Sequence, residues 1–237
     1  MADQSLIERL KQGVVAWNEW KANQPGTPPL DLSETDFAEV NVHLDGIDLT
    51  FCNLQGCNFS GFQAAQAHFD SADLQGANLS RTNLRSAHFF GADLSHALLA
   101  GAVLRGANFH AANLTGANLS GADLSQADLS CARLNGAILT GADLSRTDFL
   151  QTSLKGTDFS SCLFGGLTVF GQLDLSEARG LDRIRHDGTV ILDILSIYMS
   201  AGNIPEPLLR AASLPESFLT LIPTLDFEEE EGDAKAP

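Results

Sequence analysis

The chain has few basic residues, few aromatic residues, few cysteines and no long uncharged apolar run. Its 237 residues include 14 Lys and Arg against 30 Asp and Glu, which gives a formal net charge of −16. This charge has the wrong sign for contacts with phosphate backbones or with an anionic membrane surface. We therefore expect no direct nucleic-acid binding and no membrane binding.

The four cysteines are too few for a disulfide framework in a chain of this length, and none has the spacing of a metal site. The N-terminus is acidic, and Asp193 interrupts the most apolar late segment. These features predict neither a signal peptide nor a membrane-spanning helix. The expectation is a soluble cytoplasmic protein in a reducing compartment.

Aromatic residues make up only 7% of the chain, although 44% of the residues are apolar. The apolar fraction excludes a largely disordered protein. Because aromatic side chains are scarce, the core must be built mainly from aliphatic side chains.

A five-residue repeat dominates the sequence. From Leu44 to Phe164, all 25 positions spaced by five are Leu or Phe, except Ala64. Two residues before them, from Ala67 to Cys162, lie 15 Ala, four Thr and one Cys, and 14 of the 21 Gly lie two residues after the central position. This period fits neither a helix nor a regular strand.

A five-residue unit must form one short extended side and one corner. Residues two apart on the extended side point the same way, so the small residue and the central Leu or Phe both face inward. Glycine supplies the backbone freedom that the corner needs, and the intervening Asp or Asn faces outward and hydrogen-bonds to nearby backbone.

The number of sides per coil follows from the phenylalanines. Phe69, Phe89, Phe109 and Phe149 recur at multiples of 20 residues, which predicts coils of four sides. At residues 61–65 the large and small side chains exchange places, as Phe62 and Ala64, so we expect a bulge or a loop there.

The tandem pattern Ala-(Asp/Asn)-Leu-x-x resembles that of the pentapeptide-repeat proteins, over about 130 to 145 residues. The resemblance implies an all-β solenoid, a right-handed quadrilateral β-helix. Total length, residues 5–8 and the divergent C-terminal segment further resemble a member of this family that regulates heterocyst differentiation in cyanobacteria.

The domain prediction has four parts. Residues 1–30 form an N-terminal helical cap and linker, 31–176 the β-helix, 177–225 a C-terminal helical cap, and 226–237 an acidic disordered tail.

Within the N-terminal cap, Ser5 and Glu8 indicate a capping box that begins one helix, with Ile7, Leu10, Val14 and Trp17 on its buried stripe. The first coil is expected to be irregular, and the five-residue phase ends after Leu175. Residues 189–198 are predicted to form a buried helix ended by Gly202, followed by short helices near 205–212 and 215–222.

No nucleophile elbow, phosphate loop or zinc-protease motif occurs, so neither an enzyme nor a cofactor is expected. His68 and His88 would stack on neighbouring coils, but Asn108 and Asp128 follow in the same column and supply no third ligand of the same kind. We therefore predict no metal site. Cys52, Cys57 and Cys162 take the small inward position, and only Cys131 faces outward.

The candidate partner-binding residues lie where the outer walls depart from small polar side chains. In the four-sided arrangement, five residues meet across one corner of two coils: Arg85, His88, Phe90, Arg105 and His110. An aromatic residue flanked by Arg and His is typical of an interface centre. Leu98 and Ile138 form a weaker second patch, and residues 61–65 a third.

The sequence thus predicts a monomeric, non-enzymatic interaction scaffold with a protein partner. The further resemblance to the member that regulates heterocyst differentiation implies that this partner is the heterocyst master transcription regulator HetR, and that binding counters its inhibitory peptide. Since some family members resemble duplex DNA in shape and charge, an alternative is a DNA-mimicking protein that binds DNA gyrase. Residues 31–176 carry 15 acidic and six basic side chains, but Arg85 and Arg105 interrupt the acidic wall.

Overall fold

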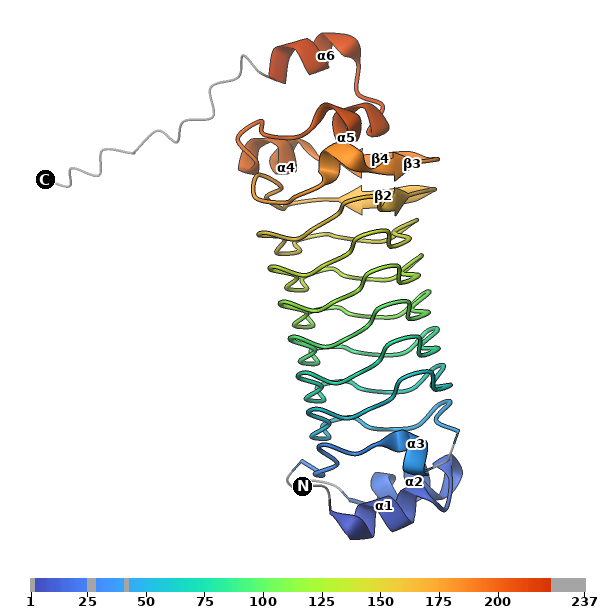
Figure 1. The fold of residues 1–237 in the computed structure, drawn as a ribbon. Coiled ribbons are helices and arrows are strands. Elements are labelled where there is room, and N and C mark those ends of the chain that lie inside the picture. Colours follow the sequence, from blue (N-terminus) through green and yellow to red (C-terminus); the bar gives the residue numbers. More distant parts are fainter. Residues whose placement is uncertain (1–2, 25–28, 41–42, 223–237) are drawn as a thin grey trace, which may run out of the picture.

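The chain forms a tall stack of coils with short helices at both ends (Figure 1). This computed structural model describes residues 3–24, 29–40 and 43–222. Its helices are α1 Gln4–Leu10, α2 Val14–Ala22, α3 Phe37–Val40, η1 Leu181–Arg183, α4 Ile194–Met199, α5 Glu206–Ala211 and α6 Glu216–Leu221. Its strands are β1 Leu163–Phe164, β2 Leu167–Phe170, β3 Arg185–His186 and β4 Thr189–Leu192.

Each regular coil has four sides, as the spacing of the phenylalanines predicted. Single parallel bridges join residues that are 20 apart, as in Asp73 with Asp93 and Asn113 with Arg133, and a bridge occurs at every fifth residue along the chain. We number the sides by their central residues. Side 1 contains 44, 64, 84 and 104, side 2 contains 49, 69, 89 and 109, side 3 contains 54, 74, 94 and 114, and side 4 contains 59, 79, 99 and 119.

The interior is filled as predicted by the central residue and the small residue two places before it. Both positions are buried along the regular coils, and the Asp or Asn between them faces outward. Phe69, Phe89 and Phe109 stack with ring centroids 5.0 and 4.7 Å apart and nearly parallel planes. This column fixes which side lies over which, because rings of identical shape pack best directly above one another.

Backbone groups are satisfied between coils and within corners. The N–H of Leu74 donates to the carbonyl of Asp93 in the next coil at 2.6 Å. The outward Asp73 accepts from the N–H of Gln75 at 3.1 Å, which is the local bond expected of this position. Corners have positive φ, as at Gly76 with φ 67°, but Arg81 with φ 57° shows that they are not restricted to glycine.

The N-terminal segment differs from the predicted single helix. Asp3, rather than Ser5, caps α1, because its side chain accepts a hydrogen bond from the Ser5 N–H at 2.8 Å. The chain then breaks at Gly13, whose φ of 95° is outside helical geometry, and α2 begins at Val14. The predicted stripe is therefore divided between two helices.

The irregular first coil is confirmed. Asp31 pairs with Asn53 and Asp36 with Asn58, so this coil contains 22 residues rather than 20. The predicted bulge at residues 61–65 is wrong. Gln63 bridges Asn83 in the ordinary register, and Ala64 donates to Asn83 at 2.9 Å. Phe62 is accommodated by remaining only partly buried, so the irregularity lies one coil earlier.

The C-terminal prediction of a helix over residues 189–198 is also wrong in its first half. Residues 189–192 form β4, which pairs in parallel with β2, from Leu167 with Thr189 to Phe170 with Leu192. Alternating burial in β4 shows that one face packs on the coil and the other faces outward. Only residues from Ile194 onward form a helix, α4, which ends at Met199, before Gly202.

The five-residue phase shifts earlier than predicted. Asp143 pairs with Leu163 at 20 residues, but Asp148 pairs with Val169 at 21. One additional residue therefore enters before Leu175. The short helices predicted near 205–212 and 215–222 are present as α5 and α6. The predicted acidic tail lies outside the described residues.

None of the helices in the described ranges is long and apolar enough to cross a membrane.

Candidate interaction surface

The structure places the five predicted partner-binding residues on two adjoining sides. Arg85 and Arg105 follow the central residues of side 1, whereas His88, Phe90 and His110 flank those of side 2. We call these five residues the corner patch. The N–H of Ser86 donates to the carbonyl of Arg105 at 2.9 Å, so the two arginines occupy equivalent positions in neighbouring coils.

Within the corner patch, the structure brings Phe90 and His110 into direct contact. Their rings lie 5.7 Å apart and nearly parallel, and half of the Phe90 surface is exposed. His110 is held in this position because its Nδ1 makes a hydrogen bond of 2.8 Å with the Ser130 hydroxyl. The result is a flat aromatic surface supported by the coil above.

The two arginines are exposed, and within the described ranges neither forms an ion pair. Their guanidinium groups remain available to an incoming carboxylate. A planar guanidinium with five N–H donors is well suited to bidentate recognition of such a group. The corner patch therefore combines an aromatic surface with two cations.

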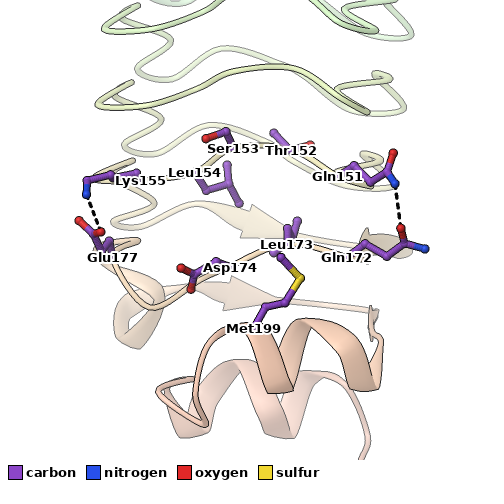
Figure 2. A pocket seen from close by; sticks show the side chains of 10 residues that line it. All are labelled: Gln151, Thr152, Ser153, Leu154, Lys155, Gln172, Leu173, Asp174, Glu177 and Met199. Atoms are coloured by element: carbon purple, nitrogen blue, oxygen red, sulfur yellow. Dashed lines mark hydrogen bonds and ion pairs between the residues drawn. The ribbon is translucent and has the colours of Figure 1, made fainter. Parts of the chain in front are cut away.

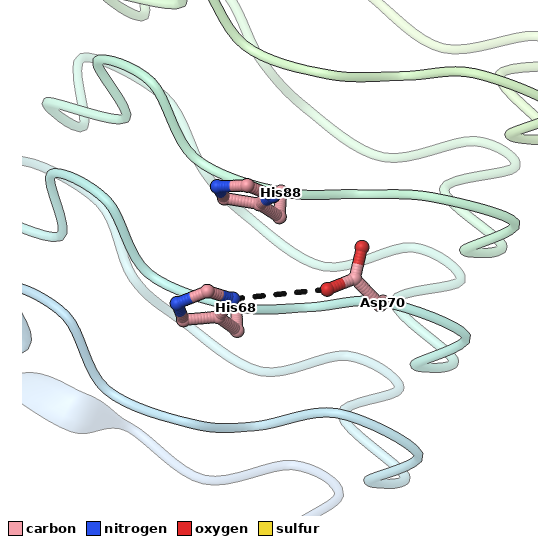
Figure 3. Close-up of side chains that lie close together, drawn as sticks. All are labelled: His68, Asp70 and His88. Atoms are coloured by element: carbon pink, nitrogen blue, oxygen red, sulfur yellow. Dashed lines mark ion pairs between the residues drawn. The ribbon is translucent and has the colours of Figure 1, made fainter.

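His88 has the neighbour that the 20-residue spacing predicts. Its ring stacks on His68 in the coil below, with centroids 4.7 Å apart. Asp70, two residues after His68 on the same side, places its Oδ2 3.8 Å from His68 Nδ1. Figure 3 shows these three side chains together on the outer wall.

Asp70 is the residue that the sequence argument missed. The column of His68 and His88 continues with Asn108 and Asp128, so this column alone offers no third histidine. Asp70 is close because residues two apart on one extended side point the same way. One ligand atom from each of His68, Asp70 and His88 lies within 4.8 Å of the others, so the prediction that no third ligand is present needs correction.

The second predicted patch is discontinuous. Leu98 and Ile138 are exposed on side 4, but Asn118 separates them by bridging to both. The third candidate, residues 61–65, is ordinary wall. Further exposed apolar side chains that the sequence argument did not select include Phe51 near the N-terminal end and Leu167, Ile191 and Ile194 near the C-terminal end.

A pocket of about 290 Å³ lies between the last regular coil and α4 (Figure 2). Two polar pairs close its rim: Lys155 with Glu177 at 2.7 Å, and Gln151 with Gln172 at 2.8 Å. Met199 of α4 lines it from the helical end. The lining residues include no histidine and no cysteine. They therefore offer neither a Ser–His nor a Cys–His catalytic pair.

Comparisons with known proteins point to one family. The model for pentapeptide repeats matches residues 47–89, 87–126 and 127–166 in eight copies, which together span slightly more than half of the chain. A comparison with curated proteins finds no match.

Several solved structures are similar to this chain. HetL, a pentapeptide repeat protein involved in heterocyst differentiation regulation from the cyanobacterium Nostoc sp. strain PCC 7120, is 24% identical over 76% of this chain and 97% of its own, with a TM-score of 0.22. A trypsin-treated form of QnrB1, a plasmid-mediated fluoroquinolone resistance protein, is 19% identical over 67% and 90%, with a TM-score of 0.40. The pentapeptide repeat protein alr5209 from Nostoc PCC 7120 is 32% identical over 52% and 86%, with a TM-score of 0.17.

Proposed function

Because the chain belongs to the pentapeptide-repeat family, we propose that it is a non-enzymatic scaffold that binds another protein through the corner patch. Members of this family are generally structural or interaction scaffolds. We further propose that the protein is a monomer in the cytoplasm, that its coils wind in the right-handed sense, and that the terminal helices cap the two ends of the β-helix.

The observation that carries this proposal is the exposed Phe90 ring, which stacks on His110 on the side that adjoins the side of the two exposed arginines. An aromatic anchor fixed by its neighbours loses little conformational entropy on binding. The Phe90 N–H is also bonded to Asp70 at 2.9 Å, so the backbone that carries the ring is anchored to the coil below. We expect the partner to present an apolar group flanked by carboxylates.

The finer proposal is that the partner is HetR, and that binding counters the inhibitory peptide of that regulator, so that this protein promotes heterocyst differentiation. Its support is the resemblance to HetL, a pentapeptide repeat protein involved in heterocyst differentiation regulation. Isothermal titration of the purified full chain with HetR tests this proposal directly. If the chain does not bind HetR but captures another protein through the corner patch, the HetR proposal is refuted and the scaffold proposal stands.

The decisive variant is Phe90→Ala with Arg105→Glu. It should weaken partner binding at least about tenfold, because truncation of a central anchor costs about 2 kcal/mol or more, and about 1.4 kcal/mol corresponds to a factor of ten. The thermal transition should stay nearly unchanged, since both side chains are on the surface. Ile138→Ala with Arg133→Glu is the matched control, because it likewise truncates one exposed apolar side chain and reverses the charge of one exposed arginine, but on sides 4 and 3. Equal affinity of the corner-patch variant and the parent chain would refute the proposal.

The alternative function is binding of DNA gyrase through mimicry of DNA. It is favoured by acidic pairs on successive coils, in which Asp123 bridges Asp143 and Asp128 bridges Asp148. Arg85 and Arg105 interrupt side 1 below these pairs. Inhibition of gyrase supercoiling at micromolar concentrations of the full chain would favour mimicry, and the absence of any effect would exclude it.

A further inference from the structure

The histidines and the aspartate of side 2 form a cluster that the scaffold function does not require. His68 and His88 are bridged through their backbones at the 20-residue register, so their imidazoles lie on successive coils of one wall. Both rings reach solvent on one edge, and 45% of the His68 side-chain surface is exposed. The backbone, rather than loop conformation, determines their separation.

Asp70 is oriented by an exception in the repeat. In most units the outward Asp or Asn accepts from the N–H two residues later, as Asp73 does from Gln75. At His88 this side chain is missing, and the Phe90 N–H instead donates to Asp70 Oδ1 in the coil below at 2.9 Å.

The same substitution occurs twice more in the solenoid. Ala65 donates to Asp45 at 2.7 Å where the local residue is Gln63, and Lys155 donates to Asn135 at 3.1 Å where the local residue is Ser153. The bond to Phe90 therefore forms because position 88 lacks an Asx residue and the coil below offers one at position 70. It occupies one carboxylate oxygen of Asp70 and leaves Oδ2 facing His68.

We propose that His68, Asp70 and His88 bind a divalent transition-metal ion of the zinc class, with open positions toward solvent. Two imidazoles and one carboxylate form a ligand set that suits Zn²⁺ and related ions rather than Mg²⁺ or Ca²⁺, which prefer oxygen ligands. Tetrahedral Zn²⁺ with bonds of about 2.0–2.2 Å requires ligand atoms roughly 3.4 Å apart. The ligand atoms of the three residues lie within 4.8 Å of one another. They must therefore approach by at most roughly 1.4 Å to reach the tetrahedral separation.

Metal binding requires one change in the cluster. The two imidazole rings are stacked, with only 21° between their planes. They must rotate so that one nitrogen of each ring and the Oδ2 of Asp70 all point at one shared ion position. Because both side chains border solvent, this rotation displaces no core residue. The ion would lie on the same wall as Phe90 and would leave coordination positions for water or for a side chain of a bound protein.

The test is isothermal titration of the full chain with ZnCl₂, in a Cys131→Ser background that removes the exposed thiol. We expect one Zn²⁺ per chain and no binding of Mg²⁺. His88→Asn should weaken Zn²⁺ binding at least tenfold while restoring the common residue of the repeat at that position. His96→Asn, which removes an exposed histidine outside the cluster at a positive-φ corner, is the matched control and should leave the affinity unchanged.

Two results would overturn the proposal: no binding by the parent chain, or unchanged binding by the double variant His68→Asn with His88→Asn. If a variant fails to fold, the parent chain still decides, because Zn²⁺ should shift the imidazole NMR signals of only two of its six histidines. No partner protein is present in these measurements. Failure of the metal proposal therefore leaves the scaffold proposal intact, and the reverse also holds.

Discussion

Single side chains at the small inward position explain how the narrow core tolerates polar residues. The hydroxyl of Thr82 donates to the Phe59 carbonyl of the coil below at 2.7 Å. Buried Thr147, Thr152 and Thr157 make the equivalent bond, and Cys162 donates its thiol proton to the Leu139 carbonyl at 3.0 Å. Since a buried hydroxyl with a partner costs little, Thr and Cys substitute for Ala without leaving an unsatisfied group.

The cysteines give a direct test of this arrangement. Burial raises the pKa of the Cys57 and Cys162 thiols to about 12 and that of Cys52 to about 11. Since the thiolate is the reactive form, these three should be inert in the native protein. A thiol reagent at pH 8 should label only exposed Cys131 until denaturant is added, when four thiols should react. Cys131→Ser should abolish native labelling, and rapid labelling of a second thiol would contradict the arrangement.

Asp70 shows where residue-level prediction from the sequence stops. The five-residue period was sufficient to place His68 on side 2 and to place His88 directly above it in the next coil. The orientation of the Asp70 carboxylate, however, depends on a hydrogen bond to the next coil, which forms because position 88 lacks an Asx side chain. That rule concerns two units at once and is not contained in the consensus of one unit.

The N-terminal helices are attached to the solenoid by a small set of polar bonds around Asp48. Trp17 of α2 is fully buried and donates its Nε1 proton to the Asp48 carbonyl at 2.7 Å. Lys21 donates to Asp48 Oδ1 at 2.7 Å and to the Thr50 carbonyl at 2.6 Å. The attachment therefore combines an apolar anchor with a partly buried ion pair.

This attachment should depend on pH. Burial favours the neutral form of Asp48, but hydrogen bonds from Lys21 and Thr50 outweigh it, so the Asp48 pKa is lowered below its ordinary value. A lowered folded-state pKa contributes stability that is present above the ordinary carboxyl pKa and is lost as the pH falls through the lowered value. We therefore expect α2 to loosen in acid, below about pH 4.

Trp17 and Trp20 are the only tryptophans in the chain, so fluorescence reports on this end alone. Emission should shift to longer wavelength as the pH falls below about 4. Asp48→Asn should weaken the attachment by roughly 1 kcal/mol at pH 7 and should reduce the acid-dependent shift. Glu19→Gln, which neutralises an exposed carboxyl group of α2, serves as the control. An identical acid shift in Asp48→Asn and the parent chain would show that Asp48 does not control the attachment.

The segments at the two ends were the hardest to predict because they lack the period. Residues 189–192 are apolar over a length that fits either a helix or a strand, and periodicity alone does not distinguish the two. The free edge of β2 decides the outcome, since β4 satisfies its backbone groups by parallel pairing. Similarly, Gly13 divides the first helix where the apolar stripe continues without interruption.

The solenoid as a unit follows from the repeat almost completely, because each coil repeats the contacts of its neighbours. Twenty-residue pairing, inward Leu and Ala, outward Asp and Asn, and the phenylalanine column were all predicted from the period and are present. In such a quasi-one-dimensional array, stability is close to a sum of terms for coils and for the interfaces between them. One coil should therefore be removable without loss of the fold.

Deletion of residues 107–126 removes one complete coil and joins Gly106 to Ala127, which occupies the same position in its unit as Ala107. We expect this variant to keep one cooperative thermal transition at a lower Tm, with unchanged circular dichroism per residue. Deletion of residues 107–113 is the control, because it joins Gly106 to Leu114 and forces a large side chain into a small inward position, so it should lose cooperative unfolding. If the two deletions behaved alike, the twenty-residue coil would not be the unit of folding, and stability would instead reside in the ends.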